Sequence, residues 1–334
     1  MRMALAGGGL LLLAAVLVDV TWTTMAPGSG AGPLTDRLTK LLWRGAHSST
    51  KFLPRHRTLA FAGVIIVFSV LASWIILVSV GWLLIYSSAD GAVLDATTGA
   101  PGDLVNRVYF TGYSVFTLGL GDYVPGDGLW QVATVIATGT GLVLVTLSIT
   151  YLVPVASAAT QRRQLAAYVS SLGESPEAIL ERSWTGSSFG SLDQHLGSLV
   201  PMVHMVALQH LTYPVLHYLH SNDPRRAAAP AITTLSQTVF LLRHAVAPDA
   251  RPDALTLRAL DTAIEDLLVA AARHAVRTSP GAVPAPSLDG LRDAAVPTVD
   301  ETAYGAAIER SAARRGRLAG YLADDGWELP AAVI

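Results

Sequence analysis

The sequence contains no cysteine and few charged residues. Asp, Glu, Lys and Arg make up 14% of its 334 residues, against about a quarter in a soluble domain. The absence of cysteine excludes disulfides, thiolate zinc sites, iron–sulfur clusters and cysteine nucleophiles. A formal net charge of −2 excludes a broadly basic protein that binds nucleic acid. With 51% hydrophobic residues, the composition indicates a membrane protein.

The hydrophobic residues are concentrated in two long uncharged runs. Residues 59–86 form a run of 28 residues without a charge, and residues 128–161 form another of 34. A helix needs about 20 apolar residues to cross the hydrocarbon layer of a bilayer. We therefore expect two membrane-spanning helices, over 59–86 and 129–158.

A shorter apolar stretch, Met3–Val18, stands at the beginning of the sequence and is interrupted by Asp19. It suits a marginal span, a helix lying on the membrane or the core of a signal peptide. Residues 27–58 hold six basic residues and one acidic residue, whereas residues 87–128 hold five acidic residues and one basic residue. The positive-inside rule places 27–58, a basic linker, in the cytoplasm and 87–128 outside. Since cleavage of a signal peptide would export the linker, we expect 1–26 to be a membrane anchor.

Residues 161–334 have a different character. They hold 15 of the 23 basic residues and 18 of the 25 acidic ones. Ser175 followed by Pro176 is typical of a helix start. Further helices are expected over 228–246, 252–277 and 299–322, with a linker rich in Pro, Ala and Gly near 278–297. This part is predicted to be an all-α cytoplasmic domain.

The most informative motif, Thr117-Leu118-Gly119-Leu120-Gly121-Asp122, lies between the two expected spans. It resembles the pore loop of the potassium-channel superfamily, whose filter usually reads Thr-Val-Gly-Tyr-Gly-Asp. The version here is most similar to the second filter of animal two-pore-domain potassium channels. The resemblance covers about 59–158. It implies a pore domain over 59–160: an outer helix (59–86), a pore loop (104–125) with a pore helix and re-entrant selectivity filter, and an inner helix (129–158).

The resemblance also implies how the filter would bind ions. A cation that enters a narrow pore loses water, and backbone carbonyl oxygens replace it. Here these would be the carbonyls of Thr117, Leu118, Gly119 and Leu120, with K⁺ as the bound ion. Gly119 and Gly121 permit the backbone conformations that align the carbonyls. One loop supplies a quarter of a ring, so four copies of the chain would assemble as a homotetramer. The alternative is an extracellular β-turn with two incidental glycines.

Other positions match the same family and imply supporting roles. Tyr109, Phe110 and Tyr113 would lie behind the filter, and Asp122 would stand at its outer mouth. Leu120, however, replaces the tyrosine whose hydroxyl normally braces the filter, and Phe116 replaces a second threonine. These departures keep a non-selective monovalent cation channel open as an alternative.

Three positions of the inner helix suggest a gate. Gly141 aligns with the hinge glycine of the family, and Gly139 and Pro154 are further points at which the helix could bend. Close helix contact is the alternative for the glycines. For Pro154 the alternative is the point where the helix leaves the bilayer.

Seven of the nine histidines fall in the C-terminal half: His195, His204, His210, His217, His220, His244 and His274. Ordinary packing in a helical bundle, pH sensing and metal binding are three interpretations of this enrichment. No nucleophile–base pair, phosphate-binding loop or metal triad is found at usable spacing, so an enzyme is not expected.

The sequence therefore predicts a passive potassium-selective channel that is a multi-pass protein of the cell membrane. Its partners would be the lipid bilayer, K⁺ and three further copies of the chain, without nucleic acid or a resident cofactor, and with a regulatory ligand unknown. The pore mouth would face outside and the C-terminal domain the cytoplasm. The scarcity of lysine against arginine is typical of a GC-rich genome and suggests a bacterial source. A different class, a membrane-anchored receptor or assembly protein with a vestigial pore, stays open.

Overall fold

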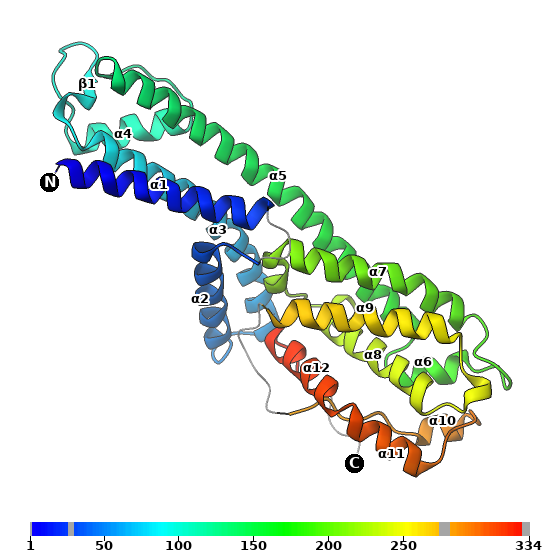
Figure 1. Cartoon of the computed structure of the whole chain (residues 1–334). Coiled ribbons are helices and arrows are strands. Elements are labelled where there is room, and N and C mark those ends of the chain that lie inside the picture. Colours follow the sequence, from blue (N-terminus) through cyan, green and yellow to red (C-terminus); the bar gives the residue numbers. More distant parts are fainter. Residues whose placement is uncertain (1, 26–29, 274–280, 329–334) are drawn as a thin grey trace. The chain divides into compact units, whose positions relative to one another are not determined.

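A computed structural model describes residues 2–25, 30–273 and 281–328, and most of them are helical (Figure 1). In chain order the helices are α1 (Arg2–Met25), α2 (Pro33–Ser49), α3 (Arg55–Tyr86), α4 (Leu104–Val115), α5 (Leu129–Leu172), α6 (Pro176–Ser183), α7 (Leu192–Thr212), α8 (Ala228–His244), α9 (Ala254–Ala272), α10 (Asp289–Asp293), α11 (Glu301–Arg310) and α12 (Ala312–Asp324). The chain divides into two compact units. The first unit comprises Met1–Thr39 and Ile65–Pro154, and the second comprises Lys40–Val64 and Val155–Ile334.

Among the described residues, three helices are long and apolar enough to cross a membrane. They are α1, α3 and α5, whose most apolar windows have mean hydropathies of 2.2, 2.7 and 2.0. In the first unit these helices run side by side (Figure 1). A Cβ on Gly9 of α1 would lie 2.5 Å from the carbonyl oxygen of Gly81 on α3, so the small residues let these two helices touch. The two expected spans are confirmed as helices, and α1 joins them as a third candidate span.

Asp19 does not end α1, because its buried carboxylate is fully engaged. One oxygen accepts hydrogen bonds from the backbone N–H groups of Leu34 (2.8 Å) and Thr35 (3.2 Å). The other accepts from the Thr35 hydroxyl (2.6 Å) and from the indole N–H of Trp74 (2.9 Å). Leu34 and Thr35 belong to the first turn of α2, where a negative charge is favourable. The carboxylate thus links α1 to the first turn of α2 and also to α3.

Two short strands, absent from the sequence-based expectation, form in the segment between the spans. β1 (Val93–Asp95) pairs antiparallel with β2 (Tyr123–Pro125), and Leu94 lies opposite Val124. The ribbon ties together the two ends of the segment that holds the pore-loop motif. The basic segment 27–58, expected as a linker, also contains a helix, α2, because Pro33 suits the first helical position and Asp19 caps its start.

Helix α5 is longer than expected. The inner helix was expected to end at residue 158, yet α5 continues to Leu172 and includes Pro154. Its last part buries Leu165, Ala166 and Val169 in the core of the second unit, and this burial stabilises a helix beyond the apolar run. Arg162, also buried, donates to the carbonyl of Leu216 (2.5 Å).

The second unit is a helical bundle built from α6 to α12 and the end of α5. The helix start predicted at Ser175 and Pro176 is confirmed as the start of α6, since the Ser175 hydroxyl accepts a hydrogen bond from the Ala178 amide at 3.1 Å. The helices expected over 228–246 and 252–277 are α8 and α9, although residues 274–280 lie outside the described part of the chain. The segment 278–297 contains the short α10. The single helix expected over 299–322 is instead two, α11 and α12, because the Ser311 amide bonds the carbonyls of both Ala307 and Ile308 in a tight turn.

Three of the histidines in the C-terminal half lie in a buried group of polar side chains. His210, His217 and His220 are all buried. Nε2 of His217 is hydrogen-bonded to the carboxylate of Asp324, and His220 Nδ1 lies 3.6 Å from Asp325. No group of three or more His, Asp or Glu suited to a metal occurs among the described residues, so the metal interpretation has no support there. His274 lies outside the described residues.

His244, at the end of α8, gives the second unit a predicted pH dependence. Burial, and then the charges of Arg243, Arg251 and Arg310, lower its pKa from the usual 6.5. The unfolded chain therefore binds a proton on this histidine more readily than the folded chain does. The free energy of unfolding is not reduced by His244 above about pH 6.5, and it decreases as the pH falls below that value. We expect the melting temperature of His244→Gln to fall less than that of the wild type between about pH 8 and pH 5. Equal falls would contradict this account.

Candidate functional site

The pore-loop motif begins where α4 ends. The side chain of Asp103 caps the start of α4 by accepting from the Asn106 amide at 2.9 Å. At the other end, the amides of Thr117 and Leu118 donate to the carbonyls of Ser114 (3.1 Å) and Tyr113 (2.8 Å). These tight turns close the helix and turn the chain into an irregular extended segment.

The backbone of this segment alternates in handedness. Thr117, Gly119 and Gly121 have positive φ values of 60°, 60° and 88°. Leu118 and Leu120 between them keep the ordinary negative φ. A left-handed conformation is cheap for glycine but strained for threonine, and such strain is concentrated at functional sites. The alternation turns successive peptide planes so that their carbonyls can face one side.

The side chains of the segment are exposed in the single chain. Phe116, Leu118 and Leu120 expose 49%, 63% and 52% of their surface. A Cβ on Gly119 or Gly121 would meet no atom within 4 Å. The irregular backbone of this segment is therefore flanked by exposed apolar side chains.

Aromatic residues of α4 contact the end of the motif, the chain just after it and α3. The Tyr109 hydroxyl donates to the carboxylate of Asp122 at 2.7 Å, and the Tyr113 hydroxyl donates to the carbonyl of Tyr123. Phe110 is buried and packs edge-to-face against Tyr86 of α3, with ring centroids 5.0 Å apart. Leu120 has no hydroxyl that could donate a hydrogen bond. The two tyrosines instead link α4 to the last residue of the motif and to the residue that follows it.

Arg107 is a supporting residue that sequence reasoning missed. It is buried, and its guanidinium group donates to the carbonyls of Gly102 (2.9 Å), Tyr86 (2.9 Å) and Asp90 (3.3 Å). It therefore fastens α4 to the last turn of α3. The available signal was that Arg107 is the one basic residue in 87–128.

Replacing Arg107 with methionine should destabilise the first unit by about 2 to 4 kcal/mol, because two buried carbonyls and a partly buried one lose a charged donor. Arg107→Lys should recover only part of this loss, since an ammonium group cannot reproduce the planar fork of a guanidinium. Thermal unfolding of the purified protein in detergent measures the effect. Arg37→Met, an exposed arginine of α2, is the matched control. Equal stability of the two methionine variants would contradict the assignment.

The expected hinge positions have distinct surroundings. A Cβ on Gly141 would lie 1.9 Å from the carbonyl oxygen of Val115, so this glycine lets α5 touch the end of α4. That contact favours the close-packing alternative for Gly141. Gly139 has open space around it and lines an apolar cavity with Leu13 and Leu17 of α1. Pro154 lies inside α5, which continues beyond it.

Comparisons with known proteins agree with this geometry. Residues 64–158 match the family model described as "Ion channel". Over 315 residues the chain is 32% identical to the uncharacterized membrane protein YdjJ of Bacillus subtilis (strain 168), covering 94% of this chain and 92% of that protein. No solved structure matches. The matched residues contain α4, the alternating segment and most of both flanking helices. The chain therefore belongs to the family of the membrane protein YdjJ and carries an ion-channel domain of the pore-loop type.

Proposed function

We propose that this protein is a passive potassium channel whose pore is assembled from four copies of the chain. The observation that carries the proposal is the alternation of positive and negative φ over Thr117, Leu118, Gly119, Leu120 and Gly121. Stacked carbonyls that face one side can replace the water of a cation one ring at a time. The Thr117 hydroxyl adds one more oxygen at the inner end.

Four copies are proposed because a single chain cannot surround an ion with this segment. The apolar side chains that α4 and α5 expose supply the surface for neighbouring copies and for lipid. They include Leu104, Val105, Val108, Val132, Val135, Ile136, Leu142 and Val143. Cyclic symmetry would bring four filter segments around one axis. In this assembly the acidic segment 87–128 lies outside the cell and the second unit lies in the cytoplasm, following the distribution of basic residues.

Potassium selectivity is favoured over general cation permeation by the support behind the filter. A filter without the usual tyrosine at position 120 loses one brace. The hydrogen bonds of Tyr109 to Asp122 and of Tyr113 to the Tyr123 carbonyl supply two others. A braced filter holds its carbonyls at a spacing suited to one ion size, one of the two explanations offered for selectivity.

Opening is proposed to involve a bend of α5 below the filter. Proline lacks a backbone N–H, so Pro154 weakens the helix there. A Cβ on Gly139 would meet no atom within 4 Å, so in the single chain no neighbouring group packs directly against the helix at that point. Gly141, held against Val115, is the less suitable hinge.

The proposal is tested by counting subunits and measuring ion flux on the same preparation. Native mass spectrometry of the protein in detergent should give a mass of four chains. Vesicles that contain the protein should release K⁺ down its gradient when a protonophore balances the charge. A dimer or monomer without flux would contradict the proposal and would favour the anchored receptor or assembly protein.

A further inference from the structure

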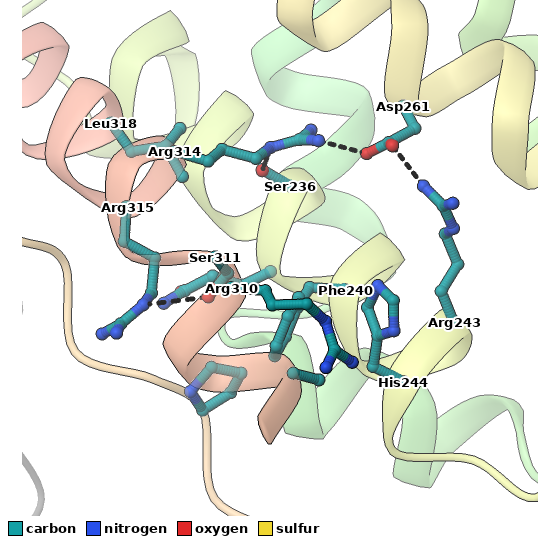
Figure 2. Close-up of a pocket in the computed structure, with 13 residues that line it drawn as sticks. Ser236, Phe240, Arg243, His244, Asp261, Arg310, Ser311, Arg314, Arg315 and Leu318 are labelled. Atoms are coloured by element: carbon teal, nitrogen blue, oxygen red, sulfur yellow. Dashed lines mark hydrogen bonds and ion pairs between the residues drawn. The ribbon is translucent and has the colours of Figure 1, made fainter. Parts of the chain in front are cut away.

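A cavity of about 190 Å³ lies in the second unit, apart from the ion-channel domain (Figure 2). Helix α8 forms one wall, and the junction of α11 and α12 forms the other. The side chains that matter below are Phe240, Arg243, His244, Arg310, Arg314 and Arg315. Nothing in the proposed conduction of ions uses this cavity.

The lining is strongly basic. Four arginines and His244 line the cavity, and the only carboxylate among the lining residues is Asp261 of α9. Arg243 and Arg314 both form ion pairs with Asp261, so two guanidinium groups share one negative charge. Arg310 and Arg315 have no carboxylate partner among the described residues. The cavity therefore holds an excess of positive charge.

Two guanidinium groups in the cavity have unused donors. Arg310 is an exposed residue, and its side chain makes no hydrogen bond or ion pair with any residue that the structure describes. Figure 2 shows it extending from the end of α11 toward His244 and Phe240. Nη2 of Arg314 is buried and finds no partner in the described chain. Buried donors are nearly always satisfied in folded proteins, so the unpaired Nη2 of Arg314 points to a missing acceptor.

His244 reports the electrostatic potential in the cavity. After burial, three arginines are the main causes of its lowered pKa: Arg243 on its own helix, Arg251 and Arg310. Asp261 on α9 acts in the opposite direction and does not offset them. An anion placed here would relieve the mutual repulsion of the cationic groups.

We propose that this cavity binds a small soluble phosphorylated anion, with its phosphoryl group held by Arg310 and Arg314. The guanidinium group of Arg310 can offer a phosphate two parallel donors. Arg314 already donates through Nε to Ser236 and through Nη1 to Asp261, so it would add Nη2. The volume of the cavity is several times the roughly 30 Å³ that one water molecule occupies in the liquid. It therefore has room for a phosphoryl group and a few further atoms. Phe240 offers an apolar face to the remainder of the ligand.

The first test is a calorimetric titration of the full chain in detergent with inorganic phosphate and pyrophosphate at constant ionic strength. We expect saturable binding of one anion per chain. Arg310→Gln should weaken it at least about tenfold, because a charged hydrogen-bond donor is lost. This variant should fold normally, since the side chain of Arg310 is exposed and makes no hydrogen bond or ion pair with the described residues. Arg258→Gln, which removes an exposed arginine of α9 outside the cavity, should bind like the wild type.

A second measurement locates the site directly. Phenylglyoxal, which reacts with arginine side chains, should modify Arg310 more slowly in the presence of pyrophosphate, as read by peptide mass spectrometry. Modification of Arg258 should keep its rate. Absence of saturable binding, equal binding by Arg310→Gln, or equal protection of both arginines would each overturn the proposal. Both measurements are made without ion conduction, so their outcome is independent of whether the protein is a potassium channel.

Discussion

Replacing Gly119 with aspartate is expected to reduce potassium conduction to the level of a protein-free membrane. Gly119 has φ +60°, and a side chain there costs roughly 1 to 2 kcal/mol in each copy. In the proposed tetramer the four new carboxylates would also crowd the pore and bind cations too tightly for them to leave. The single chain should still fold, because a Cβ on Gly119 meets no atom within 4 Å. Potassium flux into vesicles measures the effect.

The matched control is Gly99→Asp. Gly99 also has a positive φ, +68°, and open space around its Cβ position, but it lies in the loop before α4. It therefore receives the same charge and a similar strain outside the filter. Flux close to the wild-type value in Gly99→Asp, with none in Gly119→Asp, supports the filter assignment. Equal flux in both variants would contradict it.

The second large effect is expected from Asp19→Leu. This change leaves the donors of Leu34, Thr35 and Trp74 without their acceptor inside the first unit. At about 1 to 3 kcal/mol for each buried unsatisfied group, the loss should be at least about 3 kcal/mol. A lower melting temperature in detergent and faster proteolysis between α1 and α2 should accompany it.

Asp127→Leu is the control for this substitution, because Asp127 is an exposed acid of the same unit. It should melt close to the wild type. If Asp19→Leu were as stable as the control, the carboxylate would not fasten α1 to α2 and α3, and the anchoring of α1 would need another explanation.

Features encoded by nearby residues could be predicted from the sequence. The uncharged runs identify α3 and α5, since the length of apolar sequence is what a bilayer demands. The two glycines of the motif, Gly119 and Gly121, were expected to take backbone conformations that favour glycine, and both have positive φ; the positive φ of Thr117 was not expected. Tyr109, Phe110 and Tyr113 belong to α4, and their role behind the filter stays a prediction from the resemblance.

Features that depend on distant partners could not be predicted. Asp19 interrupts the hydropathy of α1, and only Thr35 and Trp74, far along the chain, explain why the helix continues. The length of α5 depends on a core that its last residues share with the second unit. The division between α11 and α12 rests on one backbone turn at Ser311. The residues around the basic cavity are scattered from Ser236 to Leu318 and form no motif.

The central claim is tested most directly by the reversal potential of the reconstituted protein in a planar bilayer, with potassium on one side and sodium on the other. We expect a value near the potassium equilibrium potential, because in the proposed tetramer the carbonyl rings of Thr117 to Leu120 would favour potassium over sodium. A clear current that reverses near zero would contradict selectivity, and would mean that Leu120 and Phe116 give a non-selective cation channel.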